Sequence, residues 1–205
     1  MWTEGDKKIV LDWAGIDEYC AEYGAFLKQL YGDYREFADA LVADVRLAAE
    51  QVKANSDQFH RRSYLRAFFA FVEGALFARR NIVSKLLERE PGGTAWGHLS
   101  DGERTLLDEI EYQLEDGGQV KVRLRNFQPF LKYLRFTFNV YFKYHDKVNP
   151  VDYSGVGWQA FKRVHEARNR ITHPKTRTEL DVSDAELTDL DTAYAWFLEQ
   201  INKKS

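Results

Sequence analysis

The sequence has one cysteine, Cys20, and no long apolar run. A single cysteine excludes a disulfide within the chain, which fits a reducing compartment such as the cytosol. The longest apolar stretch, around residues 67–72, meets Glu73 far short of the roughly 20 residues that a membrane-spanning helix needs. The start of the chain, MWTEGD, lacks the basic segment and apolar run of a secretion signal. We therefore expect a cytoplasmic protein with no membrane contact.

Several signatures of enzymes and repeat proteins are missing as well. The chain has no phosphate-binding glycine loop, no G-x-S-x-G motif and no repeat with a period of about 20 to 50 residues. The closest group of histidine and acidic residues is His98, Asp101 and Glu103, and its spacing matches no metal site. Ser100 followed three residues later by Glu103 instead predicts a capped helix start. We expect neither a metal nor a cofactor.

The composition is that of a globular protein. Hydrophobic residues make up 44% of the 205 residues and aromatic residues 15%, which is enough for a substantial core and too much for a disordered chain. The patterns of apolar residues are helical over most of the length. We therefore predict an all-α fold, an antiparallel helical bundle with an additional N-terminal helical segment.

The formal charge of −3 is unevenly distributed. Residues 1–60 contain twelve acidic and six basic residues, whereas residues 121–147 carry +6 and residues 161–177 carry +5. Two basic segments in an acidic chain suggest one face that attracts a polyanion such as RNA. A solvated surface with counter-charges folded over it explains the same counts. The candidate RNA-binding residues are Lys162, Arg163, Arg170, Lys175 and Arg177.

The spacing of apolar residues predicts which segments are helical and suggests that the chain has two parts. Residues 1–60 are expected to form an acidic helical extension, in which Gly32 either divides one helix or only weakens it, and residues 61–205 the bundle. Residues 119–125 are expected to be extended but too isolated to build a sheet. The expected helices cover residues 16–54, 61–90, 100–114, 127–144, 156–172 and about 183–201.

The helix over residues 156–172 contains an arginine in an apolar face. On a helical wheel, Arg168 falls in the middle of that face, whose apolar positions are Trp158, Phe161, Val164 and Ile171. A guanidinium in such a place is costly unless a carboxylate, phosphate or carbonyl accepts its hydrogen bonds. Glu73, at the edge of the apolar stripe of residues 61–90, is one candidate partner, although it could equally be a surface residue that pairs with Arg80 or with nothing.

A histidine follows Arg168 at the predicted end of this helix. Pro174 disfavours α-helical geometry at His173, so we expect the helix to end there and the imidazole to turn back beside Arg168. A fixed cation and a group that exchanges protons near neutral pH would then share one cleft. A simpler interpretation is a capped helix end, with His173 on the terminal carbonyls and Arg168 paired with Glu73 or Glu166.

The sequence Arg168-Asn169-x-x-x-His173 resembles the R-x4-6-H motif of HEPN-domain proteins, including the polar residue after the arginine. The following polar turn and final amphipathic helix are similar to that family too, and the resemblance covers about residues 61–202. It implies a helical bundle and a metal-independent endoribonuclease, of the toxin or phage-defence kind, that works as a homodimer. An antitoxin is a further implied partner.

The chemistry implied by this resemblance needs few protein groups, because RNA carries its own nucleophile, the 2'-hydroxyl. His173 would transfer protons, since the ordinary pKa of histidine, about 6.5, lies near neutral pH. Arg168 would bind two phosphate oxygens, Asn169 would position the backbone or the histidine, and Glu73 would support Arg168. Family analogy implies a 2',3'-cyclic phosphate and a 5'-hydroxyl as products. In a homodimer the apolar stripe around Arg168 would be the subunit interface.

Two alternatives remain open at this point. Many HEPN-like domains serve for binding or assembly, so the chain could be a non-catalytic module that binds RNA, a nucleotide or a protein. The aromatic helix over residues 127–144, which contains Lys132, Arg135 and Lys143, could stack on RNA bases or be core on most sides. The apolar content of that helix favours the core.

Overall fold

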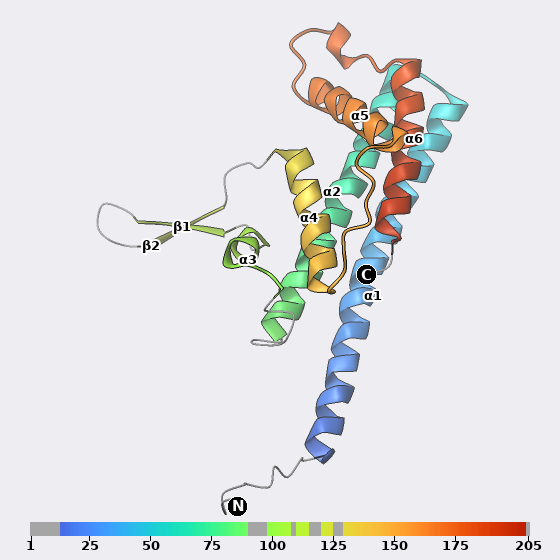
Figure 1. Cartoon of the computed structure of the whole chain (residues 1–205). Coiled ribbons are helices and arrows are strands. Elements are labelled where there is room, and N and C mark those ends of the chain that lie inside the picture. Colours follow the sequence, from blue (N-terminus) through green and yellow to red (C-terminus); the bar gives the residue numbers. More distant parts are fainter. Residues whose placement is uncertain (1–12, 90–97, 108–109, 115–119, 125–128, 204–205) are drawn as a thin grey trace, which may run out of the picture. The chain divides into compact units, whose positions relative to one another are not determined.

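The computed structural model describes residues 13–89, 98–107, 110–114, 120–124 and 129–203, and within these the chain is mostly helical (Figure 1). The elements in chain order are α1 (Trp13–Ala54), α2 (Gln58–Arg89), α3 (Asp101–Leu107), β1 (Ile110–Leu114), β2 (Val120–Leu124), α4 (Phe130–Tyr144), α5 (Val156–Thr172), η2 (Thr178–Leu180) and α6 (Asp184–Ile201). The predominantly helical fold agrees with the sequence prediction.

The chain divides into two compact units, residues 1–36 and residues 37–205. The division falls within α1, so the predicted domain boundary near residue 60 lies inside the larger unit. Gly32 does not interrupt α1. In the larger unit, the second half of α1 packs on α2, where a Cβ atom added at Gly74 would come within 2.5 Å of the Leu41 side chain. The glycine therefore permits the close approach of the two helices.

The central helix of the larger unit is α2, which contacts α3, α4, α5 and α6 (Figure 1). Its sequence predicts a broad apolar stripe, and every residue of that stripe is buried. These residues are Leu65, Phe68, Phe69, Val72, Leu76, Val83, Leu86 and Leu87. A helix with so wide an apolar face must be covered on several sides. The four helices in contact with α2 provide that cover.

The helices α5 and α6 pack tightly against each other. A Cβ atom at Gly157 would lie only 2.4 Å from the Cβ of Trp196, so glycine is required where these helices meet. The four apolar residues of α5 predicted to share one face are all buried: Trp158, Phe161, Val164 and Ile171. They are covered by helices of the same chain. The expectation that this stripe is a subunit interface is therefore wrong, because the bundle itself already buries it.

One predicted helix is wrong in part. The helix beginning after Ser100 was expected to continue through Leu114, but α3 ends at Leu107 and β1 and β2 pair as an antiparallel hairpin. Apolar residues alternate with polar residues in both strands, and the register pairs Ile110 with Leu124 and Leu114 with Val120. Alternation with a period of two is the pattern of a strand. The segment after residue 119 is extended as predicted. The prediction that it is too isolated to build a sheet is wrong, because it pairs with β1.

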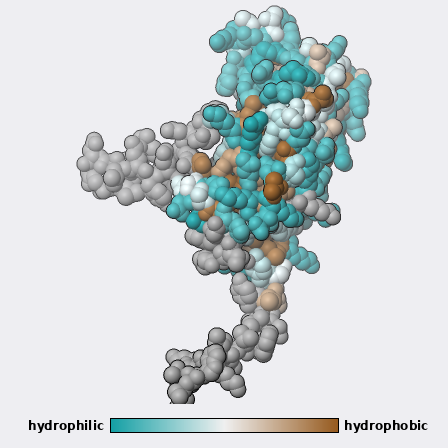
Figure 2. Space-filling view, in the orientation of Figure 1, coloured by the Kyte–Doolittle hydropathy of each residue, from teal (hydrophilic) through white to brown (hydrophobic). Residues whose placement is uncertain are grey.

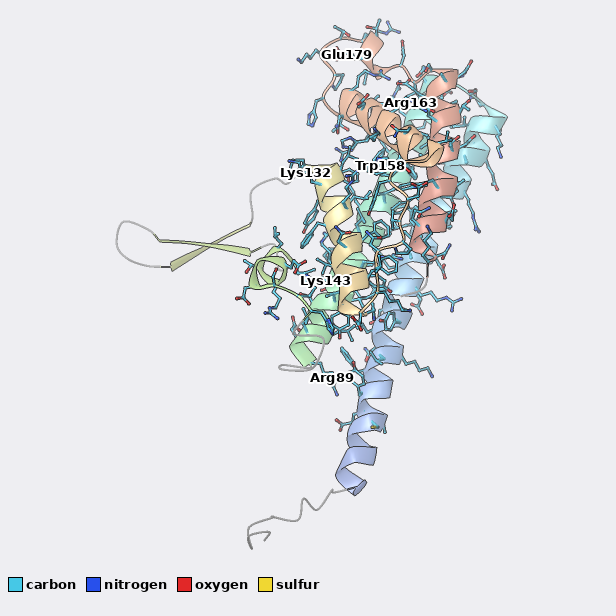
Figure 3. The ribbon with its side chains drawn as sticks, viewed as in Figure 1. Arg89, Lys132, Lys143, Trp158, Arg163 and Glu179 are labelled. Carbon is cyan, nitrogen blue, oxygen red and sulfur yellow. The ribbon has the colours of Figure 1, made fainter. Side chains whose placement is uncertain are left out.

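The aromatic helix α4 is mainly core. Leu134, Phe138 and Phe142 are fully buried, while Lys132 and Lys143 are exposed. Lys143 pairs with Glu103 of α3 at 2.8 Å, and the Arg135 guanidinium lies over the Trp158 ring at 5.1 Å. Figure 3 shows Lys132 and Lys143 at opposite ends of α4. Two of the three basic side chains of α4 thus interact within the chain.

The start of α3 and the start of α6 are capped as the sequence predicts. Ser100 with Glu103, and Ser183 with Glu186, form the reciprocal bonds of a capping box. In the part of the chain that the structure describes, no helix combines the length and apolar character needed to cross a membrane. The surface seen in Figure 2 is mostly hydrophilic, with separate apolar spots.

Candidate functional site

The candidate site lies at the end of α5. The helix ends at Thr172, where the Thr172 hydroxyl donates to the Arg168 carbonyl at 2.7 Å. The backbone N–H of His173 still donates to the Asn169 carbonyl at 3.1 Å, but the His173 backbone, with φ −127° and ψ 55°, has left helical geometry. Pro174 follows, so the predicted helix end is confirmed.

Arg168 is paired as the sequence analysis suggests. Its Nη2 donates to Glu73 Oε1 of α2 at 2.8 Å, its Nη1 donates to Asn169 Oδ1 at 3.3 Å, and the guanidinium lies 5.9 Å from the centre of the Phe69 ring. The side chain remains 30% exposed. Arg168 thus sits at the edge of the apolar face rather than in its middle, where an anion from solvent can still reach it.

A second histidine, which the sequence analysis missed, joins this group. His165 is half-buried one turn before Asn169, and its Nε2 is 3.4 Å from Asn169 Nδ2. Burial, together with the positive charge of Arg168, lowers the pKa of His165, while Glu166 acts in the opposite direction. The available signal was its spacing, three residues before Arg168 and four before Asn169, which places all three on one side of a helix.

His173 is placed differently from His165. Its side chain is exposed, and within the described residues its imidazole makes no hydrogen bond or ion pair. The expected contact with Arg168 is not formed. Five residues of helix correspond to a rotation of about 140° around the axis, so the backbone alone does not align the two side chains. His173 is therefore accessible to a ligand but is not fixed by the chain.

The candidate RNA-binding residues fall into two groups. Arg163 forms two hydrogen bonds with Asp189 of α6, at 2.7 and 2.6 Å, which lower the pKa of that carboxyl group. Arg170 pairs with Glu186 at 2.6 Å. By contrast, Lys162, Lys175 and Arg177 form no ion pair with any residue that the structure describes. Part of the basic segment is thus neutralised within the fold.

Arg170 also holds the segment that follows His173. Its Nη1 donates to the carbonyl oxygens of Glu179 and Asp181, at 2.6 and 2.8 Å. From α2, Arg61 donates to the Val182 carbonyl at 2.9 Å. Figure 3 shows Glu179 beyond the end of α5, on the segment that leads to α6. Because both sides of the connection are anchored, His173 begins a segment whose path is defined.

Neither the family models, nor the curated proteins, nor the solved structures give a match to this chain. Across the described ranges, no group of three or more histidine, cysteine, aspartate or glutamate residues is arranged to hold a metal ion.

We expect the pair of Glu73 and Arg168 to orient the guanidinium rather than to hold the fold together. The two side chains are 47% and 30% exposed, and solvent screens ion pairs of this kind. A double-mutant cycle with Glu73→Gln and Arg168→Gln, measured by urea denaturation, should give a coupling free energy of about 0.2–1 kcal/mol. A coupling above about 2 kcal/mol would show that the pair is a main structural contact.

Proposed function

We propose that this protein is a metal-independent endoribonuclease that uses Arg168 and His173. The observation that supports the proposal is the arrangement at the end of α5. Arg168 is oriented by Glu73 and Asn169 but remains open to solvent, and the exposed imidazole of His173 follows within two turns. Arginine is suited to a phosphate because its rigid fork binds two oxygens at once. Histidine is suited to proton transfer at neutral pH.

The reaction would proceed by attack of the RNA 2'-oxygen on the adjacent phosphorus. His173 removes the proton of the 2'-hydroxyl, and Arg168 stabilises the negative charge that develops on the non-bridging oxygens. The bond from phosphorus to the 5'-oxygen breaks, and a general acid protonates that oxygen. The products are a 2',3'-cyclic phosphate and a 5'-hydroxyl end. Asn169 contributes by holding Arg168 through its Oδ1.

A homodimer would provide the general acid as His173 of the second copy, because a two-fold axis places equivalent residues on both sides of one phosphate. The exposed apolar surface supports this partner. Phe77 is 51% exposed, and it follows Glu73 by four residues on the same side of α2. An apolar contact can therefore form beside the proposed site. An antitoxin that covers the site would fit a toxin or phage-defence role.

A second candidate function is non-catalytic binding of RNA. The observation that favours it over cleavage is that Arg168, the cation proposed to stabilise the reacting phosphate, is already paired with Glu73. Arg163 and Arg170 are likewise paired, with Asp189 and Glu186, so binding would fall to the remaining cations of the segment. The cations without an ion pair in the described chain, Lys162, Lys175 and Arg177, would then form a modest phosphate-binding surface.

Incubation of the purified protein with single-stranded RNA in excess EDTA tests the proposal. We expect cleavage to continue without divalent metal and the upstream products to carry 2',3'-cyclic phosphate ends, detected by mass spectrometry. Strict dependence on a divalent metal would contradict the proposal. Salt-sensitive binding of RNA without any cleavage would instead support the binding module.

A further inference from the structure

His165 completes a chain of hydrogen bonds that begins on another helix. Glu73 of α2 accepts from Arg168 Nη2 at 2.8 Å, and Arg168 Nη1 donates to Asn169 Oδ1 at 3.3 Å. Asn169 Nδ2 then faces His165 Nε2 at 3.4 Å. Four side chains from two helices are thus connected in one line, and His165 is its last member.

The direction of every hydrogen bond in this line follows from chemistry. Arginine only donates, so the amide group of Asn169 must present its oxygen to Arg168 and its NH2 group to His165. His165 Nε2 must then accept, which requires a neutral ring with its proton on Nδ1. A protonated ring would direct an N–H group at the NH2 group of Asn169. The network is therefore compatible with only one protonation state of His165.

The His165 ring is also held in position by aromatic contacts. It stacks on Phe130 of α4, with ring centres 5.0 Å apart and planes 8° from parallel, and Phe69 of α2 lies at 6.1 Å. The stack continues from Phe130 to Phe161 and from Phe161 to Trp158, at 6.3 and 5.7 Å. Trp158 and Phe161 are fully buried, so the plane of the imidazole is defined by the core.

The surroundings of His165 favour the neutral ring. Burial lowers its pKa first and the charge of Arg168 second, while Glu166 on the same helix raises it. The rings that contact it from α2 and α4 are the uncharged Phe69 and Phe130, and Glu73 is connected to it through Arg168 and Asn169. Protonation below neutral pH would therefore place two positive groups side by side and remove the acceptor of Asn169.

We propose that His165 is a positioning residue that keeps Asn169 and Arg168 in the orientation needed for phosphate binding, and that its protonation releases them. This inference rests on the proposed ribonuclease function. It implies that acid inactivates the protein through a residue that never touches RNA. Since the pKa of the folded state lies below the ordinary value, the stability associated with neutral His165 is complete above about pH 6.5 and declines as the pH falls toward the folded-state pKa.

Two variants separate the hydrogen bond from the ring stacking. His165→Gln retains an acceptor for Asn169 but cannot be protonated, and His165→Phe retains the stacking but has no acceptor. We expect His165→Phe to lose about ten- to hundredfold in kcat for RNA cleavage at every pH, because a misplaced cation costs that much. We expect His165→Gln to cleave RNA at pH 7.5 within a few-fold of the rate of the natural protein. In the natural protein the cleavage rate should fall as His165 becomes protonated at lower pH, and in His165→Gln this part of the fall should be absent.

NMR spectroscopy provides a readout that does not depend on activity. In the natural protein the ring nitrogens of His165 should show a proton on Nδ1 at pH 7.5, and the Asn169 NH2 resonances should shift with the titration of His165. In His165→Gln those resonances should not move over the same range. The inference would be overturned if His165→Phe cleaved RNA at the wild-type rate, or if the Asn169 resonances did not shift as His165 titrates. If the natural protein binds but never cuts RNA, the ribonuclease proposal fails, and the NMR measurement alone decides whether His165 positions Asn169.

Discussion

Replacement of His173 by alanine is expected to reduce RNA cleavage by about a hundredfold to ten-thousandfold, the usual contribution of a positioned proton-transfer group. The fold should not change, because the His173 side chain is exposed and forms no hydrogen bond or ion pair within the described residues. The backbone bond from His173 to Asn169 does not depend on the side chain. Initial rates on a labelled RNA, together with circular dichroism and sedimentation of the variant, provide the measurement.

A matched control for this variant is His98→Ala. The side chain of His98 is 38% exposed, and its Nδ1 lies 3.8 Å from Asp146 Oδ1. The control removes one histidine from the surface without touching α5, so its cleavage rate should equal that of the natural protein. Wild-type cleavage by His173→Ala would exclude His173 as the base. Equal losses in the two variants would show that the assay responds to something other than the proposed site.

Replacement of Phe161 by alanine is expected to lower the free energy of unfolding by about 3–5 kcal/mol, the usual cost of removing a fully buried aromatic ring. Phe161 has no exposed surface. Its ring stacks on Trp158 at 5.7 Å and packs edge-on against Phe68 at 5.9 Å. The cavity left by alanine would be surrounded by other buried rings, which cannot collapse to fill it.

Denaturation in urea, followed by circular dichroism and tryptophan fluorescence, measures this loss. Phe59→Ala is the matched control, because Phe59 is 63% exposed and the same atoms are removed. The control should change the free energy of unfolding by no more than about 0.5 kcal/mol. Similar losses in both variants would mean that α2, α5 and α6 do not form the core described above.

The helices could be predicted from sequence because their apolar residues repeat with the period of a helix over many turns. Pro174 then placed the end of α5 correctly, and the Ser183 capping box placed the start of α6. The β-hairpin was missed for a physical reason. The five residues Ile110–Leu114 are too few to distinguish a helical from an alternating pattern, and the pairing with β2 is a contact between separate segments.

The site was predicted in part. An arginine in an apolar face requires a hydrogen-bond acceptor, and the place of Glu73 at the edge of the α2 stripe made it one candidate, which the structure bears out. His165 was not identified, because the R-x4-6-H motif includes only the histidine that follows the arginine, His173. The role of His165 depends on the Phe130 ring and the Asn169 amide. The first contact joins helices distant in sequence, and no pattern within α5 reveals it.

Arg170 connects the three segments around the end of α5, so we expect them to unfold locally together. One guanidinium binds the carbonyl oxygens of Glu179 and Asp181 and also the carboxylate of Glu186, so it joins the last turn of α5, the connecting segment and the first turn of α6. Withdrawal of that side chain would break all three of these contacts at once. Amide protons in these places should therefore exchange with solvent as a single cooperative unit.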